Sequence, residues 1–172
     1  MHELRWLDCN DYESGAWEEC GRETTVESSN LAAEYYVASL LLRLGYVVTV
    51  TFGNTKEIDL IVYDPATKKT VTIDVKGLKN TSNWVMPSEK KLVERPSHFY
   101  VLVAFKNKIE QLEVSPEVYT IPSTAVRRLW RSWSGRPDVK NINYRDVKNK
   151  EELKGEAGFE QLFGSRGSST KS

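Results

Sequence analysis

Hydrophobic residues recur at helical spacing between residues 31 and 44, which predicts an amphipathic helix. Asn30 is a residue type that caps helix starts, and Gly45 directly follows the last apolar position, as is typical of a helix end. Three runs rich in β-branched and aromatic residues predict strands at 46–52, 58–63 and 70–76. The polar turn 64–69 between the last two runs indicates a β-hairpin.

The second half of the chain predicts further elements around one central strand. Residues 99–105 form a continuous apolar run, which favours a strand buried on both faces. We expect short helices at 88–93 and 155–163, a short strand at 119–121, and a helix over 124–133 capped by Ser123. This order predicts an α/β (α+β) fold with a mixed central β-sheet flanked by helices, although no pattern fixes the strand order.

Charge divides the chain into parts. Residues 1–30 hold eight acidic residues against two basic ones, and since the formal net charge of all 172 residues is zero, this acidic N-terminal arm at −6 leaves +6 for the rest. Residues 31–163 are expected to form one domain, because a chain of this length fits a single core. Residues 164–172 are rich in Gly, Ser and Thr, which predicts a disordered tail.

Several classes of protein are disfavoured by what the sequence lacks. No apolar run approaches the ~20 residues of a membrane span, and the acidic start is unlike a signal peptide, so we expect a cytoplasmic protein. Cys9 and Cys20 have no neighbouring cluster that would complete a zinc site and are interpreted as ordinary thiols. Neither His2 nor His98 has the partners of a nucleophile and base pair, and no Gly-rich phosphate loop is present.

The strand predicted at 70–76 carries the most informative chemistry. Side chains alternate between the two faces of a strand, so Asp74 and Lys76 share the face opposite the apolar positions. The apolar positions, expected to face the core, are Val71, Ile73 and Val75. Asp59 opens the preceding strand, close enough in a hairpin to bring a second carboxylate near Asp74.

Two converging carboxylates repel each other unless a cation compensates them. Mg²⁺ prefers oxygen ligands such as Asp59, Asp74 and the carbonyl of Val75, and Lys76 would then lie beside a scissile phosphate. The alternative is that Asp-x-Lys belongs to a solvated strand face and Asp59 to a turn, and either residue set alone is more often structural.

Glu34 lies on or beside the apolar stripe of the first helix, whose members are Leu31, Val37, Ala38 and Leu41. A carboxylate in that position needs a partner, and a metal-bound water, a second metal or Lys76 would each supply one. The alternative is that it reaches the surface or pairs with an arginine.

In combination these segments resemble the core of PD-(D/E)xK nucleases, the restriction-endonuclease-like family that includes Holliday-junction resolvases. The resemblance rests on a helical glutamate, a Gly-Tyr pair, Ile-Asp-Leu, a hairpin and an acid-x-Lys strand end: Ala33-Glu34, Gly45-Tyr46, Ile58-Asp59-Leu60 and Asp74-Val75-Lys76-Gly77. It implies that Glu34, Asp59 and Asp74 are acidic site residues and that Lys76 is the catalytic lysine. The chain departs from the common pattern in having Ile58 where proline often stands, and Asp74 in place of the commoner glutamate.

Basic residues outside this core are weaker candidates for contacts to nucleic acid: Lys79, Arg127, Arg128 and Arg131. The alternative for the three arginines is the solvated face of a core helix, and for Trp84 a structural role is favoured.

The sequence therefore predicts an endonuclease that depends on Mg²⁺ or Mn²⁺ and acts on nucleic acid, DNA in preference to RNA. The alternative is a catalytically inactive nuclease-like module that binds nucleic acid or a protein partner. Nucleases of this type often pair, which leaves a homodimer open.

Overall fold

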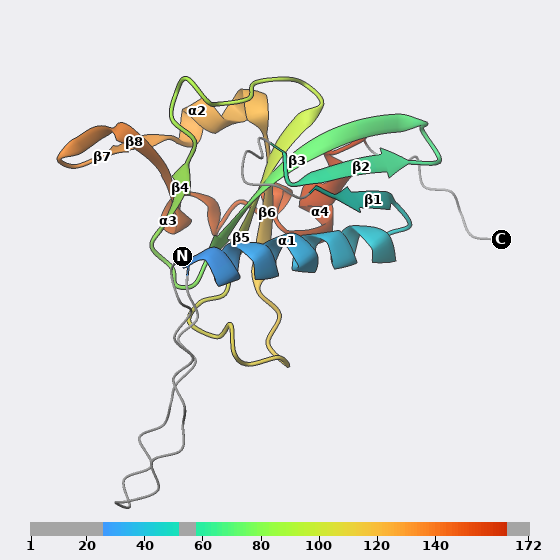
Figure 1. Cartoon of the computed structure of the whole chain (residues 1–172), viewed down its shortest axis with the longest axis horizontal. Coiled ribbons are helices and arrows are strands. Elements are labelled where there is room, and N and C mark those ends of the chain that lie inside the picture. Colours follow the sequence, from blue (N-terminus) through green and yellow to red (C-terminus); the bar gives the residue numbers. More distant parts are fainter. Residues whose placement is uncertain (1–25, 52–57, 165–172) are drawn as a thin grey trace, which may run out of the picture.

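The computed structural model describes residues 26–51 and 58–164 as a mixed α/β structure (Figure 1). A five-stranded sheet has the order β1-β2-β3-β5-β6, with antiparallel pairs except for the parallel pair β3–β5. Its strands are β1 (Val47–Val50), β2 (Leu60–Asp64), β3 (Lys69–Leu78), β5 (His98–Ala104) and β6 (Glu117–Pro122). The predicted mixed sheet flanked by helices is thus confirmed.

A second, three-stranded sheet lies beside the first. It has the order β4-β8-β7, and its strands are β4 (Asn83–Met86), β7 (Arg131–Trp133) and β8 (Arg136–Asn143). The helices are α1 (Val26–Arg43), α2 (Val126–Leu129), α3 (Tyr144–Val147) and α4 (Gly155–Glu160), with 3₁₀ turns η1 (Ser123–Ala125) and η2 (Glu151–Leu153). No helix in the described part of the chain is both long and apolar enough to cross a membrane.

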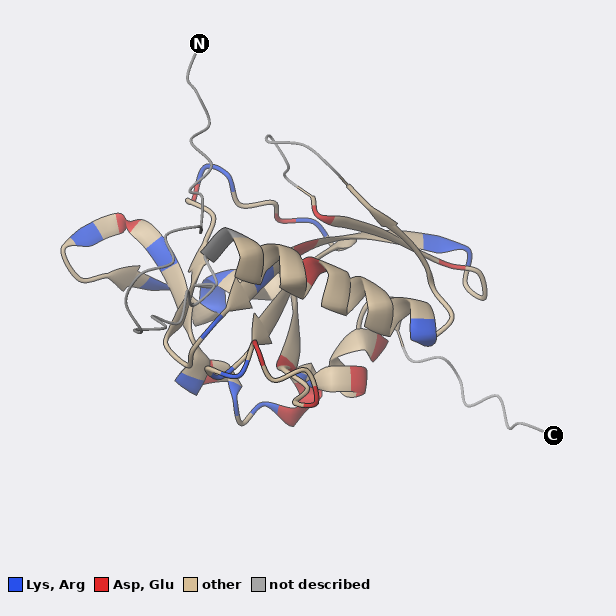
Figure 2. Ribbon diagram, turned by 60° about the horizontal axis from the view of Figure 1, so that its bottom comes forward, with Lys and Arg blue, Asp and Glu red and all other residues tan. Residues whose placement is uncertain are grey.

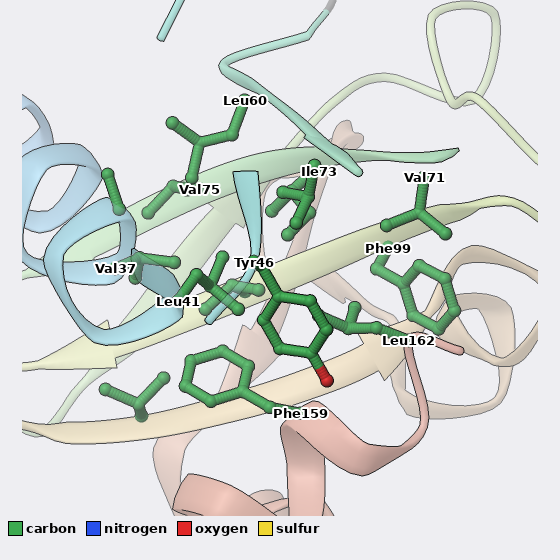
Figure 3. Close-up of a cluster of buried hydrophobic side chains, with 14 of the residues drawn as sticks. Val37, Leu41, Tyr46, Leu60, Val71, Ile73, Val75, Phe99, Phe159 and Leu162 are labelled. Carbon is green, nitrogen blue, oxygen red and sulfur yellow. The ribbon is translucent and has the colours of Figure 1, made fainter. Parts of the chain in front are cut away.

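The two faces of the main sheet bury two separate hydrophobic clusters. Helix α1 runs along one face (Figure 1, Figure 2), where its apolar side chains meet those of β2, β3, β5 and α4 (Figure 3). The cluster on the other face joins β5 and β6 to the smaller sheet, with Trp84 and Ile142 fully buried in it. Strand β5 is buried at every position, as its continuous apolar run predicted.

Helix α1 ends as predicted but begins earlier than predicted. Gly45 has a φ of 83°, and the amides of Gly45 and Tyr46 donate to the carbonyls of Leu42 (3.0 Å) and Leu41 (3.1 Å), the pattern of a Schellman cap. At the other end the helix starts at Val26, so the prediction that Asn30 caps it was wrong. The residues of the arm before Val26 and of the tail after residue 164 lie outside the described part, as do Cys9, Cys20 and His2.

Asn30 instead ties α1 to the strand that carries the candidate site. Its Oδ1 accepts a hydrogen bond from the amide of Gly77 at 2.8 Å. A Cβ on Gly77 would lie 2.5 Å from the carbonyl oxygen of Ser29, so only glycine permits this approach of the helix to the strand. Lys76 is thus followed directly by the glycine at which α1 docks on β3.

The β2–β3 hairpin follows the prediction, and its turn is held by Asp64. The carboxylate accepts hydrogen bonds from the Ala66 amide (3.1 Å) and the Thr67 hydroxyl (2.9 Å), while Lys68 takes the left-handed conformation with a φ of 57°. This turn sets the register in which Leu60 lies opposite Ile73.

Two predicted helices in the second half were wrong. Residues 88–93 form a turn in which the Lys91 amide donates to the Ser88 carbonyl at 2.9 Å. The helix expected over 124–133 is interrupted after Leu129, because residues 131–133 pair with β8 as a hairpin strand. Ser123 does not cap it either, since its hydroxyl bonds the backbone of Arg95.

Candidate functional site

Asp59 and Asp74 lie next to each other on the face of the main sheet opposite α1. Leu60 pairs with Ile73 and both point into the α1 cluster, so the residues that flank them, Asp59 and Asp74, turn to the other face. The Asp59 amide donates to the Ile73 carbonyl at 2.9 Å, which extends the pairing of β2 with β3 to Asp59. Each acid is only 8% exposed.

Backbone groups hold Asp59 in place. Its Oδ2 accepts a hydrogen bond of 2.7 Å from the amide of Val75, so the side chain takes a partner on β3. Its carbonyl accepts a bond of 2.9 Å from the amide of Thr51, at the end of the neighbouring β1 segment. The carboxylate is thereby fixed toward β3 before any ligand is present.

Lys76 completes the group from the same face of β3. Its Nζ donates to Oδ1 of Asp74 at 2.5 Å, and the two side chains are 27% and 11% exposed respectively. The ammonium therefore lies at the boundary between the buried acids and solvent.

The negative charge of the site is only partly compensated. Burial raises the pKa of Asp74 to about 7, with a further contribution from the charge of Asp59, even though the charge and hydrogen bond of Lys76 act to lower this pKa. Burial, together with the charge of Asp74, also raises the pKa of the neighbouring Tyr100 to about 12. A site of this kind favours the binding of an additional cation or proton.

Glu34 does not complete a three-acid ligand group. It is 7% exposed, on the helix that covers the opposite face of the sheet from Asp59 and Asp74. Within the described residues, no group of three or more His, Cys, Asp or Glu side chains is arranged to hold a metal. The structure therefore brings Asp59, Asp74 and Lys76 together, and the role of Glu34 in the site stays a prediction.

His98 is a neighbour of the site that the sequence did not identify. The parallel pairing of β3 and β5 sets His98 beside Thr72, two residues before Asp74. The imidazole is fully buried, with Nδ1 2.8 Å from the Thr72 hydroxyl and Nε2 without a hydrogen-bond partner. Burial and the charge of Arg95 lower the pKa of His98 to about 4, so this side chain is neutral near pH 7. Only the strand order, which the sequence did not supply, could have shown it.

The weaker basic candidates have different surroundings. Arg127 pairs with Glu89 at 2.6 Å and with Glu94 at 2.9 Å. Arg131 pairs with Asp146 at 2.7 Å. The remaining two candidates, Arg128 and Lys79, are exposed.

Trp84 has the structural role that was favoured for it. It is 1% exposed, and its indole N–H donates to the Val103 carbonyl at 3.1 Å. It therefore joins β4 to the central strand β5.

Comparisons with known proteins give a limited likeness. No protein-family model matches the sequence, and no curated protein matches it. Among solved structures, the chain is similar to a bacterial homing endonuclease, I-Ssp6803I, with 18% identity and a TM-score of 0.40, over 59% of this chain and 67% of that chain. A likeness of this extent does not define the activity of the chain.

Proposed function

We propose that this chain is a metal-dependent nuclease that hydrolyses phosphodiester bonds of nucleic acid, DNA in preference to RNA. The proposal rests on one observation: Asp59 and Asp74 lie side by side on one face of the sheet, and Lys76 is bound to Asp74 on that same face. The resemblance of the segments 33–34, 45–46, 58–60 and 74–77 to PD-(D/E)xK nucleases supports the same roles for these residues.

The donor set suits a small, hard divalent cation. Two carboxylates, from Asp59 and Asp74, and the carbonyl of Val75 are the oxygen ligands that Mg²⁺ or Mn²⁺ prefers, with water and phosphate oxygens as the others. The raised pKa of Asp74, about 7, supports this fit, because it indicates that Lys76 offsets only part of the negative charge of the two buried acids. When bound, such a cation polarises the phosphoryl group and makes water more acidic.

The residues of the chain would orient the substrate and stabilise charge. The Val75 amide fixes the Asp59 carboxylate, so that the pair keeps its geometry without substrate. Hydrolysis increases negative charge on the phosphoryl oxygens, and the partly exposed ammonium of Lys76 can bind that charge from the solvent side.

A second candidate function is a nuclease-like module that binds nucleic acid or a protein partner without cutting. It is favoured by one observation, that Glu34 does not join the other two acids in a ligand group within the described residues. Calorimetric titration with Mg²⁺ and with Mn²⁺ separates the two candidates. Binding at millimolar or lower concentration supports the nuclease, and its absence supports the module.

Cleavage of a supercoiled plasmid in Mg²⁺ or Mn²⁺, with EDTA as the blank, tests the proposed activity. Asp74→Asn and Lys76→Met should each reduce the rate by about 100-fold or more, because the first would remove a charged ligand of the cation and the second an ammonium that stabilises the developing negative charge. Glu113→Gln and Lys108→Met make the same chemical changes on an exposed loop and should leave the rate unchanged. If the two site variants cut as fast as the two loop variants, the assignment of the site is wrong.

A further inference from the structure

The β7–β8 hairpin extends away from the body of the molecule (Figure 1). All eight residues from 131 to 138 are exposed, and they include Trp133, which is 47% exposed. The turn is sharp, with Gly135 at a φ of 80°, and the pairing shifts register between Ser132 and Trp133. The Trp133 indole is therefore open to contact with another molecule.

The hairpin and its flanks are also the most basic part of the chain. Residues 127–148 hold seven Arg and Lys against two Asp (Figure 2). Arg127 and Arg131 are engaged by acids, but in the described residues no ion pair involves Arg128 or Arg136. Positive charge is therefore available next to an exposed indole.

We propose that the β7–β8 hairpin is an arm that holds double-stranded nucleic acid, by entering a groove of the duplex. This inference rests on the proposed nuclease function and identifies the form of its substrate. The major groove is ~12 Å wide and admits a two-stranded β-ribbon, which is the shape of this hairpin. Arg136 contacts the phosphates along the groove, and Trp133 packs against the sugars and base edges.

The root of the arm is close enough to the site for one duplex to reach both. Strand β4 begins seven residues after Lys76, so Asn83 lies within ~25 Å of Lys76 along any path of the chain. Asn83 pairs with Asn143 at the base of β8. Arg136 lies seven residues before Asn143 along β8, which adds at most ~25 Å. Two turns of duplex DNA, at ~34 Å each, exceed the combined separation.

The arm is firmly anchored at its base, so that it can hold a ligand in a defined direction. Trp84 pairs with Ile142, and both are buried in the second cluster. The Tyr144 amide, directly after β8, donates to the Ser82 carbonyl at 3.0 Å.

The aromatic content of the arm favours a duplex over a single strand. Proteins that bind single strands stack successive bases on a series of aromatic side chains. Strands β7 and β8 carry one exposed aromatic residue, Trp133. Trp130, which precedes β7, is half-buried, and the guanidinium of Arg127 lies over it, 5.2 Å from the ring centre. One indole between cations suits a groove wall better than a stack of bases.

The test measures binding of a fluorescent 30-base-pair duplex by anisotropy, in EDTA so that nothing is cut. Arg136→Ala should raise Kd about 5-fold and lower the steepness of log Kd against log salt by about 1, because one phosphate contact is lost. Trp133→Ala should raise Kd about 5- to 10-fold. Lys108→Ala, an exposed change away from the arm, should do neither.

The outcomes separate the arm from the nuclease activity. Both changes lie on exposed positions, so circular dichroism and Tm should match the wild type. Arm variants that bind the duplex as the wild type does, a wild type that does not bind it, or equal binding of the single strand would each overturn the arm. Arm-dependent binding by a protein that cuts nothing in Mg²⁺ or Mn²⁺ would support the arm and refute the nuclease.

Discussion

Replacing the buried carboxylate of Asp74 by an amide should stabilise the fold. Asp74 is 8% exposed, and burial together with Asp59 raises its pKa from the ordinary 3.8 to about 7. The folded state therefore holds this proton more tightly than the unfolded state does. Stability accordingly falls as pH rises from about 4 to about 7, which is the direction expected for an acid with a raised pKa.

The size of the effect follows from that pKa difference. The change of the Asp74 pKa from 3.8 to about 7 corresponds to about 4 kcal/mol of stability lost when Asp74 ionises in the folded state. This figure already includes the action of Lys76, which lowers the pKa of Asp74. Asp74→Asn removes the ionisation, so it should increase the free energy of unfolding by about 2 to 4 kcal/mol at pH 7.5 and raise Tm by roughly 5 to 15 °C. Near pH 3.5 the Asp74 carboxyl of the wild type is mostly protonated in both states, and the difference should largely vanish.

Urea unfolding of both proteins at pH 3.5, 5.5 and 7.5 measures this difference directly. Asp64→Asn is the matched control, because Asp64 is also buried on β2 but its carboxylate accepts hydrogen bonds from Ala66 and Thr67. At pH 7.5 Asp64→Asn should be no more stable than the wild type. If Asp74→Asn is no more stable than the wild type at pH 7.5, or if its gain in the free energy of unfolding is the same at pH 3.5, then Lys76 fully compensates the charge of the two acids and the reasoning is wrong.

Three further predictions concern other contacts that hold the fold together. Gly77→Ala should lower the free energy of unfolding by about 1 to 3 kcal/mol in urea titrations, because the new methyl group would meet the Ser29 carbonyl, and an unchanged midpoint would contradict the tight docking of α1. Burial acts to raise the pKa of Glu117, but hydrogen bonds from two tyrosines and Lys106 outweigh this and lower the pKa to about 2. The stabilisation that ionised Glu117 gives the fold should therefore be complete above pH 4.5 and disappear toward pH 2. Glu117→Gln should flatten that part of a Tm-against-pH curve, and an unchanged curve would contradict this role. Trp84→Phe should lower the free energy of unfolding by about 1 kcal/mol through loss of its hydrogen bond to Val103, and no change would show that the bond contributes nothing.

The elements that could be predicted from the sequence are those with strong local signals. Gly45 ends α1 through a cap made by its immediate neighbours, and the turn at Asp64 is closed by residues within four positions. The alternation of side chains on a strand was enough to assign Asp74 and Lys76 to one face. The position of Asp59 near Asp74 could also be predicted, because a hairpin brings its two strands together.

The elements that could not be predicted depend on distant partners. Asn30 has the chemistry of a helix cap, but its Oδ1 accepts a hydrogen bond from the backbone amide of Gly77, which is 47 residues away. The apolar spacing around Trp130 predicts a helix, yet α2 ends at Leu129 because residues 131–133 are extended and pair with strand β8. His98 reaches the neighbourhood of the site only through the parallel pairing of β3 with β5.

Anomalous diffraction from crystals soaked in Mn²⁺ shows whether Asp59 and Asp74 together bind a hard divalent cation. We expect an anomalous peak within ligand distance, about 2.0 to 2.3 Å, of a carboxylate oxygen from each acid. We also expect this peak to be lost in Asp74→Asn crystals. Well-ordered wild-type crystals with no peak at the pair, or with the same peak in both proteins, would contradict this binding.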